Sequence, residues 1–189
     1  MARLDTLLAN YKRHLAVPLR PGLPLSQRVW FCVYPPEEER RLQTFIENFQ
    51  MVTTEASIGW KQINLGGSFA NWLDSFGPQE RDEIKNDQEI VEGYAESGFC
   101  EFLAEEVSKQ AAEIPADQAP TTVFALTGLM DLYDFIDVSS VIEALSKDFQ
   151  GLLAVFFPGE RDGTSYRFLN ARTAWDYLAV PITCEEPTL

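Results

Sequence analysis

Two nearly continuous apolar runs constrain the fold of this chain more than any other feature. Residues 28–34 and 151–157 are rich in aromatic and β-branched side chains and contain almost no polar ones. Strands with one solvated face alternate between apolar and polar residues, whereas strands covered on both faces do not. These runs therefore predict parallel strands at the centre of a sheet, with Phe156 fully buried. Pro158 and Gly159 are expected to end the second strand.

Other segments alternate between strand and helix patterns. Further strands are predicted at 60–65, 121–127 and 177–182, and apolar residues at helical spacing predict helices near 37–49, 69–76, 87–112 and 139–149. Parallel strands need crossover connections, which these helices supply. The expected fold is a single α/β domain over residues 1–189, with a mainly parallel sheet of about five strands and helices on both faces.

An amphipathic helix is predicted at the N-terminus, over residues 1–16. Apolar side chains recur there at helical spacing, at Leu4, Leu7, Leu8, Tyr11 and Leu15. Residues 17–27 form a connector in which several prolines disfavour helical backbone. The helix is expected to dock either on the domain or on a partner.

Charge restricts the function classes. The chain of 189 residues has 29 acidic and 15 basic side chains, and therefore a formal net charge of −14. Such a charge repels polyphosphate, so broad, non-specific binding of DNA or RNA is not expected. No apolar stretch is long enough to span a bilayer or to form a signal sequence, which predicts a cytoplasmic protein without membrane contact.

Metal and hydrolase signatures are weak. Cys32, Cys100 and Cys184 lack the spacing of a zinc site or a disulfide framework, which predicts reduced thiols. His14 is the single histidine, and its place in an amphipathic helix favours a solvated helix face over a catalytic base. No metal or cofactor is therefore predicted.

Three aspartates raise the question of a cation site. Asp131, Asp134 and Asp137 are spaced by three, so one helix would place their carboxylates near a common face. The residues between them are apolar, however. A loop in which Asp137 or Ser139 caps the next helix is the favoured interpretation.

Nucleotide-binding motifs are absent from the sequence, and only weak glycine turns remain. There is no GxxxxGK[ST] and no GxGxxG. Gly66, Gly67 and Ser68 lie between a predicted strand and helix, where free amides could hold an anion; a turn with a serine N-cap is the favoured alternative. Thr127 and Gly128 form a second weak candidate of the same kind.

Arginine and aromatic residues gather near the C-terminus of this acidic chain. They are of the types enriched in interface hot spots, and they predict a partner-binding surface of Glu160, Arg161, Tyr166, Arg167, Arg172 and Trp175. In the alternative, Arg167 or Arg172 pairs with Glu160 or Asp176 and stiffens a long loop. The residues alone leave both interpretations open.

The same C-terminal region carries a family resemblance. The segments 155–160, 166–169 and 177–182, together with Arg3-Leu4-Asp5 and the run from Gln27 to Tyr34, resemble the BrxB family of bacteriophage exclusion (BREX) systems. The resemblance implies a role in an assembly that methylates host DNA and blocks phage replication. It implies a PglZ-like phosphatase-fold protein, a PglX-like methyltransferase and a BrxC-like ATPase as partners, and it brings no catalytic residues.

Two functions follow as hypotheses. The first is a non-enzymatic adaptor of an antiviral BREX complex that binds a PglZ-like protein. The second is an enzyme, or a nucleotide or metal sensor, with its site at the carboxyl ends of the strands. That site would bring together Tyr34, Gly66, Gly67, Thr127, Gly128 and Glu160.

Overall fold

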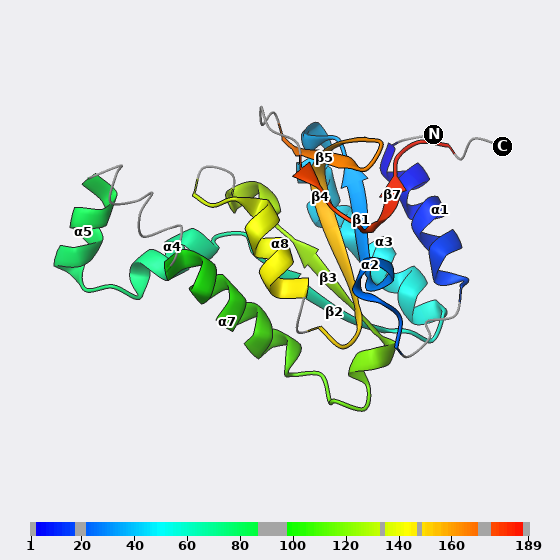
Figure 1. Cartoon of the computed structure of the whole chain (residues 1–189), viewed down its shortest axis with the longest axis horizontal. Helices are drawn as coiled ribbons and strands as arrows, with labels where there is room; N and C mark the ends of the chain where they lie inside the picture. Colours follow the sequence, from blue (N-terminus) through cyan, green and yellow to red (C-terminus); the bar gives the residue numbers. More distant parts are fainter. Residues whose placement is uncertain are drawn as a thin grey trace.

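The computed structural model describes residues 3–17, 22–86, 98–132, 135–146, 149–169 and 175–186. It has one mainly parallel sheet with helices on both faces (Figure 1), as the sequence predicts. Asp134 and Arg172 lie outside the described residues. Among the described helices, none is both long and apolar enough to cross a membrane.

Five strands pair in parallel in the order β2-β3-β4-β1-β7. Every residue of β1 (Val29–Tyr34) and β3 (Thr122–Thr127) is buried, as is β4 (Leu152–Asp162) as far as Gly159. The edge strands β2 (Gly59–Asn64) and β7 (Val180–Thr183) are more exposed. The continuous apolar runs therefore correspond to the centre of the sheet, and Phe156 is fully buried as predicted.

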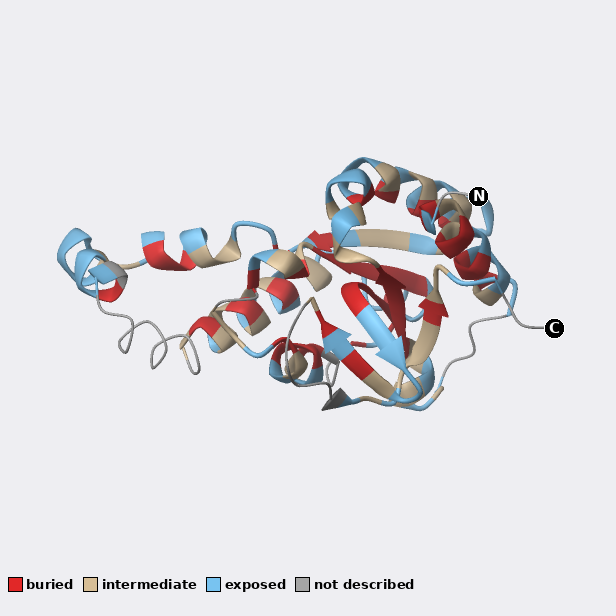
Figure 2. Cartoon of the chain, turned by 90° about the horizontal axis from the view of Figure 1, so that it is seen from above, coloured by how far each residue is buried: buried red, intermediate tan, exposed pale blue. Residues whose placement is uncertain are grey.

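Successive side chains of the central strands alternate between two hydrophobic cores, one on each side of the sheet. In β1, Trp30, Cys32 and Tyr34 face α1 (Arg3–Leu15) and α3 (Glu39–Glu55), which cover one side of the sheet. Phe31 and Val33 face the opposite side. That side is covered by α4 (Ser68–Asp74), α7 (Cys100–Ala111) and α8 (Val138–Ser146), and α5 (Pro78–Asn86) lies beyond α4 (Figures 1 and 2). The helix predicted at the N-terminus thus docks on the domain.

Short elements fill the connections. The connector between α1 and β1 ends in a short helix, α2 (Leu25–Arg28). Single helical turns lie at η1 (Pro36–Glu38), η3 (Ala119–Thr121) and η4 (Leu129–Leu132). The helix predicted over 87–112 is described from residue 98 onward, where α7 carries it; residues 87–97 lie outside the described part.

The structure corrects the prediction that Pro158 and Gly159 end a strand. β4 continues to Asp162 and turns into an antiparallel hairpin with β5 (Ser165–Phe168), which in turn pairs with the short β6 (Trp175–Asp176). Gly159 allows close strand approach, because a Cβ there would lie 2.1 Å from the carbonyl oxygen of Arg167. The last strand, predicted at 177–182, is shorter than expected, because β7 begins at Val180 and residues 177–179 are not part of a strand.

Candidate functional site

The carboxyl ends of the parallel strands surround two separate hollows. A cavity of about 110 Å³, here called the β2–β3 cavity, is lined by Gly66, Thr127 and Gly128. A wider hollow of about 380 Å³, the β1–β4 hollow, is lined by Tyr34, Glu160 and the C-terminal end of β7. The prediction that these residues converge on one site is therefore wrong, because β4 lies between β1 and β3 and separates their ends.

The glycine turn beside the β2–β3 cavity is closed by its own side chains. The amide of Gly66 donates to Asn64 Oδ1 at 2.9 Å, and the amide of Gly67 donates to Asp131 Oδ2 at 3.0 Å. An anion would have to displace a carboxylate to reach the second of these amides, so the bonding argues against the predicted anion turn. The predicted serine cap is wrong: Gly67 (φ 76°) is the N-cap of α4, no side chain caps it, and Ser68 begins the helix.

Thr127 and Gly128 have packing roles at the same place. Thr127 is buried, and its Oγ1 accepts a hydrogen bond of 3.1 Å from Gln62 Nε2. Gly128 has φ 77°, and a Cβ there would lie 2.4 Å from both Asn64 Oδ1 and the amide nitrogen of Gly66. The end of β3 therefore approaches the glycine turn so closely that only glycine fits.

Glu39 supplies a carboxylate to the wall of the β2–β3 cavity from the first turn of α3. The buried hydroxyl of Tyr34 donates a hydrogen bond to Glu39 Oε2. Burial, followed by the charge of Glu39, raises the pKa of Tyr34 far above its ordinary value. Tyr34 is thus a fixed donor that holds the carboxylate, and it is no general base at neutral pH.

The two described aspartates of the predicted trio, Asp131 and Asp137, have separate roles. Asp131 lines the β2–β3 cavity, whereas Asp137 accepts hydrogen bonds from the amide and the hydroxyl of Ser139 at 3.0 and 2.7 Å, next to the start of α8. The capping interpretation of Asp137 is confirmed. Among the described residues, no group of three or more histidine, cysteine, aspartate or glutamate side chains is placed to hold a metal ion.

The β1–β4 hollow contains a thiol and several charges. Cys184 Sγ donates to the carbonyl of Val33 at 3.5 Å, and burial and the nearby carboxylate of Glu38 raise the pKa of Cys184 to about 11. Arg3 Nη1 lies 2.6 Å from Glu37 Oε1. The Cys184 thiol is protonated at neutral pH, which suits a structural cysteine better than a nucleophile.

His14 lies away from both hollows, on α1. Its Nδ1 is 2.9 Å from the carbonyl oxygen of Asn10, and its ring packs edge-on against Trp30 at 5.7 Å between centroids. These contacts give the histidine a local packing role on the helix.

The β4–β5 hairpin has a buried face and an exposed face. Tyr166 is buried with its ring 4.6 Å from that of Phe31 and 6.0 Å from that of Phe157, and Phe168 is also buried. Tyr166 is thus a core residue, and its predicted place in a partner surface is corrected. The hydroxyl of Tyr166 is hydrogen-bonded to Arg161. Burial raises the pKa of Tyr166, and Arg161 offsets part of this rise.

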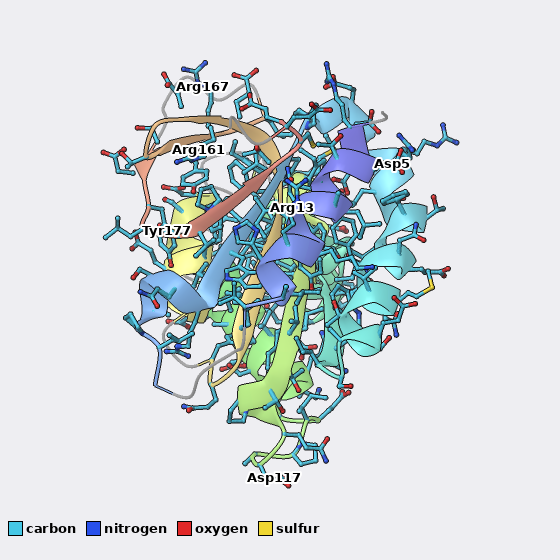
Figure 3. The ribbon with its side chains drawn as sticks, turned by 90° about the vertical axis from the view of Figure 1, so that its right-hand side faces the viewer. Asp5, Arg13, Asp117, Arg161, Arg167 and Tyr177 are labelled. Carbon is cyan, nitrogen blue, oxygen red and sulfur yellow. The ribbon has the colours of Figure 1, made fainter. Side chains whose placement is uncertain are left out.

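Glu160, Arg161 and Arg167 are exposed on this hairpin, and Figure 3 shows the two arginines at the same end of the molecule. Glu160 and Arg167 are register partners, and Arg167 Nη1 lies 4.0 Å from Glu160 Oε2. Both side chains are more than half exposed, so solvent screens this pair and its contribution to stability is small. Asp176 instead accepts from Ser165 Oγ at 2.5 Å. The backbone of Trp175 pairs with Tyr166.

Several polar side chains at the β2–β3 cavity are not among the residues predicted from the sequence, namely Glu39, Gln43, Gln62 and Asn64. A signal for Asn64 was present, because a polar residue directly before a glycine turn ends a strand at the edge where open α/β sheets bind ligands. Glu39 gave no such signal, since charge in the first turn of a helix is common without a function.

Comparison of the chain with known protein families, with curated proteins and with solved structures finds no match in any of the three.

Proposed function

We propose that this protein is a non-enzymatic adaptor of a BREX-type anti-phage assembly in the cytoplasm, and that it binds a PglZ-like protein through the β4–β5 hairpin. The observation that carries the proposal is the division of this hairpin into an anchored face and a charged, exposed face. The sequence resemblance supplies the type of assembly, with the PglX-like methyltransferase and the BrxC-like ATPase as further components.

Anchoring gives the hairpin the rigidity that a binding surface needs. Tyr166 and Phe168 insert into the same core as Phe31 and Phe157. Arg161 is held through its hydrogen bond to the Tyr166 hydroxyl, and Arg167 stands opposite Glu160 across the two strands. The anchored strands of the hairpin and the bonded Arg161 side chain therefore lose little conformational entropy when a partner binds.

Charge supports a protein partner. The chain carries a net charge of −14, and the hairpin places two exposed arginines at one end of the molecule within this acidic background, Arg167 opposite Glu160 and Arg161 opposite Tyr166. Arginine recognises carboxylates with a planar, bidentate fork. The partner surface that meets the hairpin is accordingly acidic, while the rest of the acidic exterior suits contact with the basic surfaces of DNA-binding components.

A small-molecule sensor is the second candidate. Its support is the β1–β4 hollow, whose volume of about 380 Å³ lies at the lower end of the range of ligand pockets, ~300–1,000 Å³. The hollow lies at the carboxyl ends of β1 and β4. The helix that follows β1 in the sequence covers one face of the sheet, and the helix that follows β3 covers the other face. Such switch points are where open α/β sheets place ligands.

Co-purification distinguishes the two candidates. Tagged full-length protein expressed together with the PglZ-like, PglX-like and BrxC-like proteins is expected to retain the PglZ-like protein at about physiological ionic strength. Thermal shift in the presence of nucleotides and divalent ions is expected to stay near zero. A ligand-dependent rise of several degrees without a retained partner would instead support the sensor.

A further inference from the structure

The β2–β3 cavity has a chemical character opposite to that of an anion site. Among the described residues that line it are the carboxylates of Glu39 and Asp131 and the amide side chains of Gln43, Gln62 and Asn64, with no lysine, arginine or histidine. The amide of Gly66, which lines the cavity, and that of the next residue, Gly67, already have side-chain partners. The wall therefore offers carboxylate and amide oxygens as acceptors, and no cationic side chain among the described lining residues neutralises the two carboxylates.

The two carboxylates are held in place from different elements. Glu39 belongs to the first turn of α3 and is fixed by the Tyr34 hydroxyl. Asp131 belongs to η4 and is fixed by the amide of Gly67. Each carboxylate uses one oxygen in its fixing bond, and its second oxygen has acceptor sites available for a group that binds in the cavity.

The volume of the β2–β3 cavity and the number of oxygen ligands in its wall limit the kinds of group that can bind there. A volume of about 110 Å³ is far below the ~300–1,000 Å³ of pockets that enclose nucleotides or drug-sized ligands, and it admits a group of a few heavy atoms. A divalent cation takes about six or more oxygen ligands, and among the described residues no group of three or more metal-binding side chains is placed to hold one. Two carboxylates held on different elements suit instead a planar group with several N–H donors and one positive charge.

We infer that the β2–β3 cavity binds the guanidinium group of an arginine side chain presented by a protein partner. Charge complementarity supports this occupant, since a cavity with two carboxylates in a chain of net charge −14 attracts a cation. The guanidinium donates to Glu39 and Asp131, while the amide side chains of the wall accept its remaining N–H groups. This contact is separate from the hairpin and does not depend on the function proposed above.

Titration with Nα-acetyl-arginine methylamide tests the inference, because this probe carries the side chain without any partner. Backbone amide resonances of Gly66, Gly67 and Gly128 are expected to shift and to saturate at millimolar probe concentrations. The neutral analogue Nα-acetyl-citrulline methylamide, which keeps the shape and loses the charge, is expected to leave these resonances in place at equal ionic strength.

Matched variants locate the binding. Asp131→Asn keeps an oxygen acceptor for the Gly67 amide, and Glu39→Gln keeps one for the Tyr34 hydroxyl, so both variants are expected to fold. Each is expected to weaken binding of the arginine probe by about fivefold. Asp117→Asn removes a charge from the exposed turn before β3, at the opposite end of the strands (Figure 3), and is expected to change nothing. The inference is overturned if the three glycine resonances do not saturate, if citrulline acts like arginine, or if all three variants bind equally.

Discussion

Gly128 shows how a single residue shapes the edge of the sheet. It combines a left-handed backbone (φ 77°) with contact so close that a Cβ would overlap both Asn64 and the backbone of Gly66. Gly67 has nearly the same backbone (φ 76°) but has open space around it. The two glycines, one after β2 and one after β3, therefore separate backbone strain from steric overlap at the same edge of the sheet.

Substitution of both glycines by alanine measures the two effects. Gly67→Ala is expected to lower the free energy of unfolding by about 1–2 kcal/mol, which is the cost of a left-handed backbone at a non-glycine residue. Gly128→Ala adds steric overlap and is expected to cost clearly more, with shifted resonances for Asn64 and Gly66. Urea denaturation of both variants checks the order, and equal losses would show that the end of β3 yields to an extra methyl group.

At this scale the sequence predicts burial better than it predicts partners. Phe156 is foreseeable because a run without polar residues must be covered on both faces. Tyr166 is not, because an isolated tyrosine beside arginines is equally typical of an interface and of a core. Its burial depends on Phe31 and Phe157, which are brought to it by strand pairing. The bond from Gly67 to Asp131 likewise joins segments that are far apart in the sequence.

Among the elements, α1 is tied to the far end of the chain. Asn10 Nδ2 donates to the carbonyl oxygens of Thr183 and Glu185, at 2.9 and 2.8 Å. Leu4, Leu7 and Tyr11 of the same helix are fully buried on the sheet. The helix therefore secures β7, an edge strand that pairs only with β1 among the described strands.

Asn10→Ala is expected to loosen β7 more than the rest of the fold. Loss of the side chain leaves two carbonyl groups without this partner, at a cost of about 1–3 kcal/mol. Hydrogen exchange followed by mass spectrometry is expected to show faster exchange at the end of β7 and in residues 184–186, with β3 unchanged. Equal acceleration in β3 would mean that Asn10 supports the whole fold and has no special link to β7.

The β4–β5 hairpin is the element that the sequence predicts least well. Pro158-Gly159 is a common signal for the end of a strand, but here glycine is needed because β5 passes within 2.1 Å of where a Cβ would lie. The alternation of strands and helices was readable because each parallel strand requires a crossover. An antiparallel extension of one strand produces no comparable pattern of apolar and polar residues, so the sequence does not predict it.

For the molecule as a whole, buried thiol and tyrosine hydroxyl groups are expected to lower the stability of the fold at alkaline pH. Burial raises the pKa of Cys32, Tyr11, Tyr34 and Cys184, in the last case from 9.0 to about 11. The folded state thus holds these protons more tightly than the unfolded chain does. The stabilisation from Cys184 is complete below pH 9 and is lost as the pH rises toward 11.

Denaturation of the wild type and of Cys184→Ser at about pH 8 and about pH 10.5 checks this direction. Both proteins are expected to lose stability at the higher pH, because the buried tyrosines and Cys32 remain in both. The variant is expected to lose less, since serine has no proton to release in this range. An equal loss in the two proteins would mean that Cys184 has the same pKa in the folded and unfolded states.

The central claim is that the exposed face of the β4–β5 hairpin is a binding surface for the PglZ-like protein. Arg167 lies on that face opposite its register partner Glu160, whereas Lys12 is an exposed residue of α1. Exposed substitutions shift stability by only about 0.5 kcal/mol, whereas interface anchors cost about 2 kcal/mol or more in binding. The two roles considered for Arg167, in binding and in bracing the hairpin, therefore give different results.

The direct measurement is a calorimetric titration of the purified PglZ-like protein with Arg167→Ala, with the wild type and with Lys12→Ala as a charge-matched control. Arg167→Ala is expected to keep its melting temperature within a few degrees and to raise Kd by about thirtyfold or more, while the control binds as the wild type does. An unchanged Kd would contradict the account, as would a sharp fall in melting temperature, which would make Arg167 an internal brace of the hairpin.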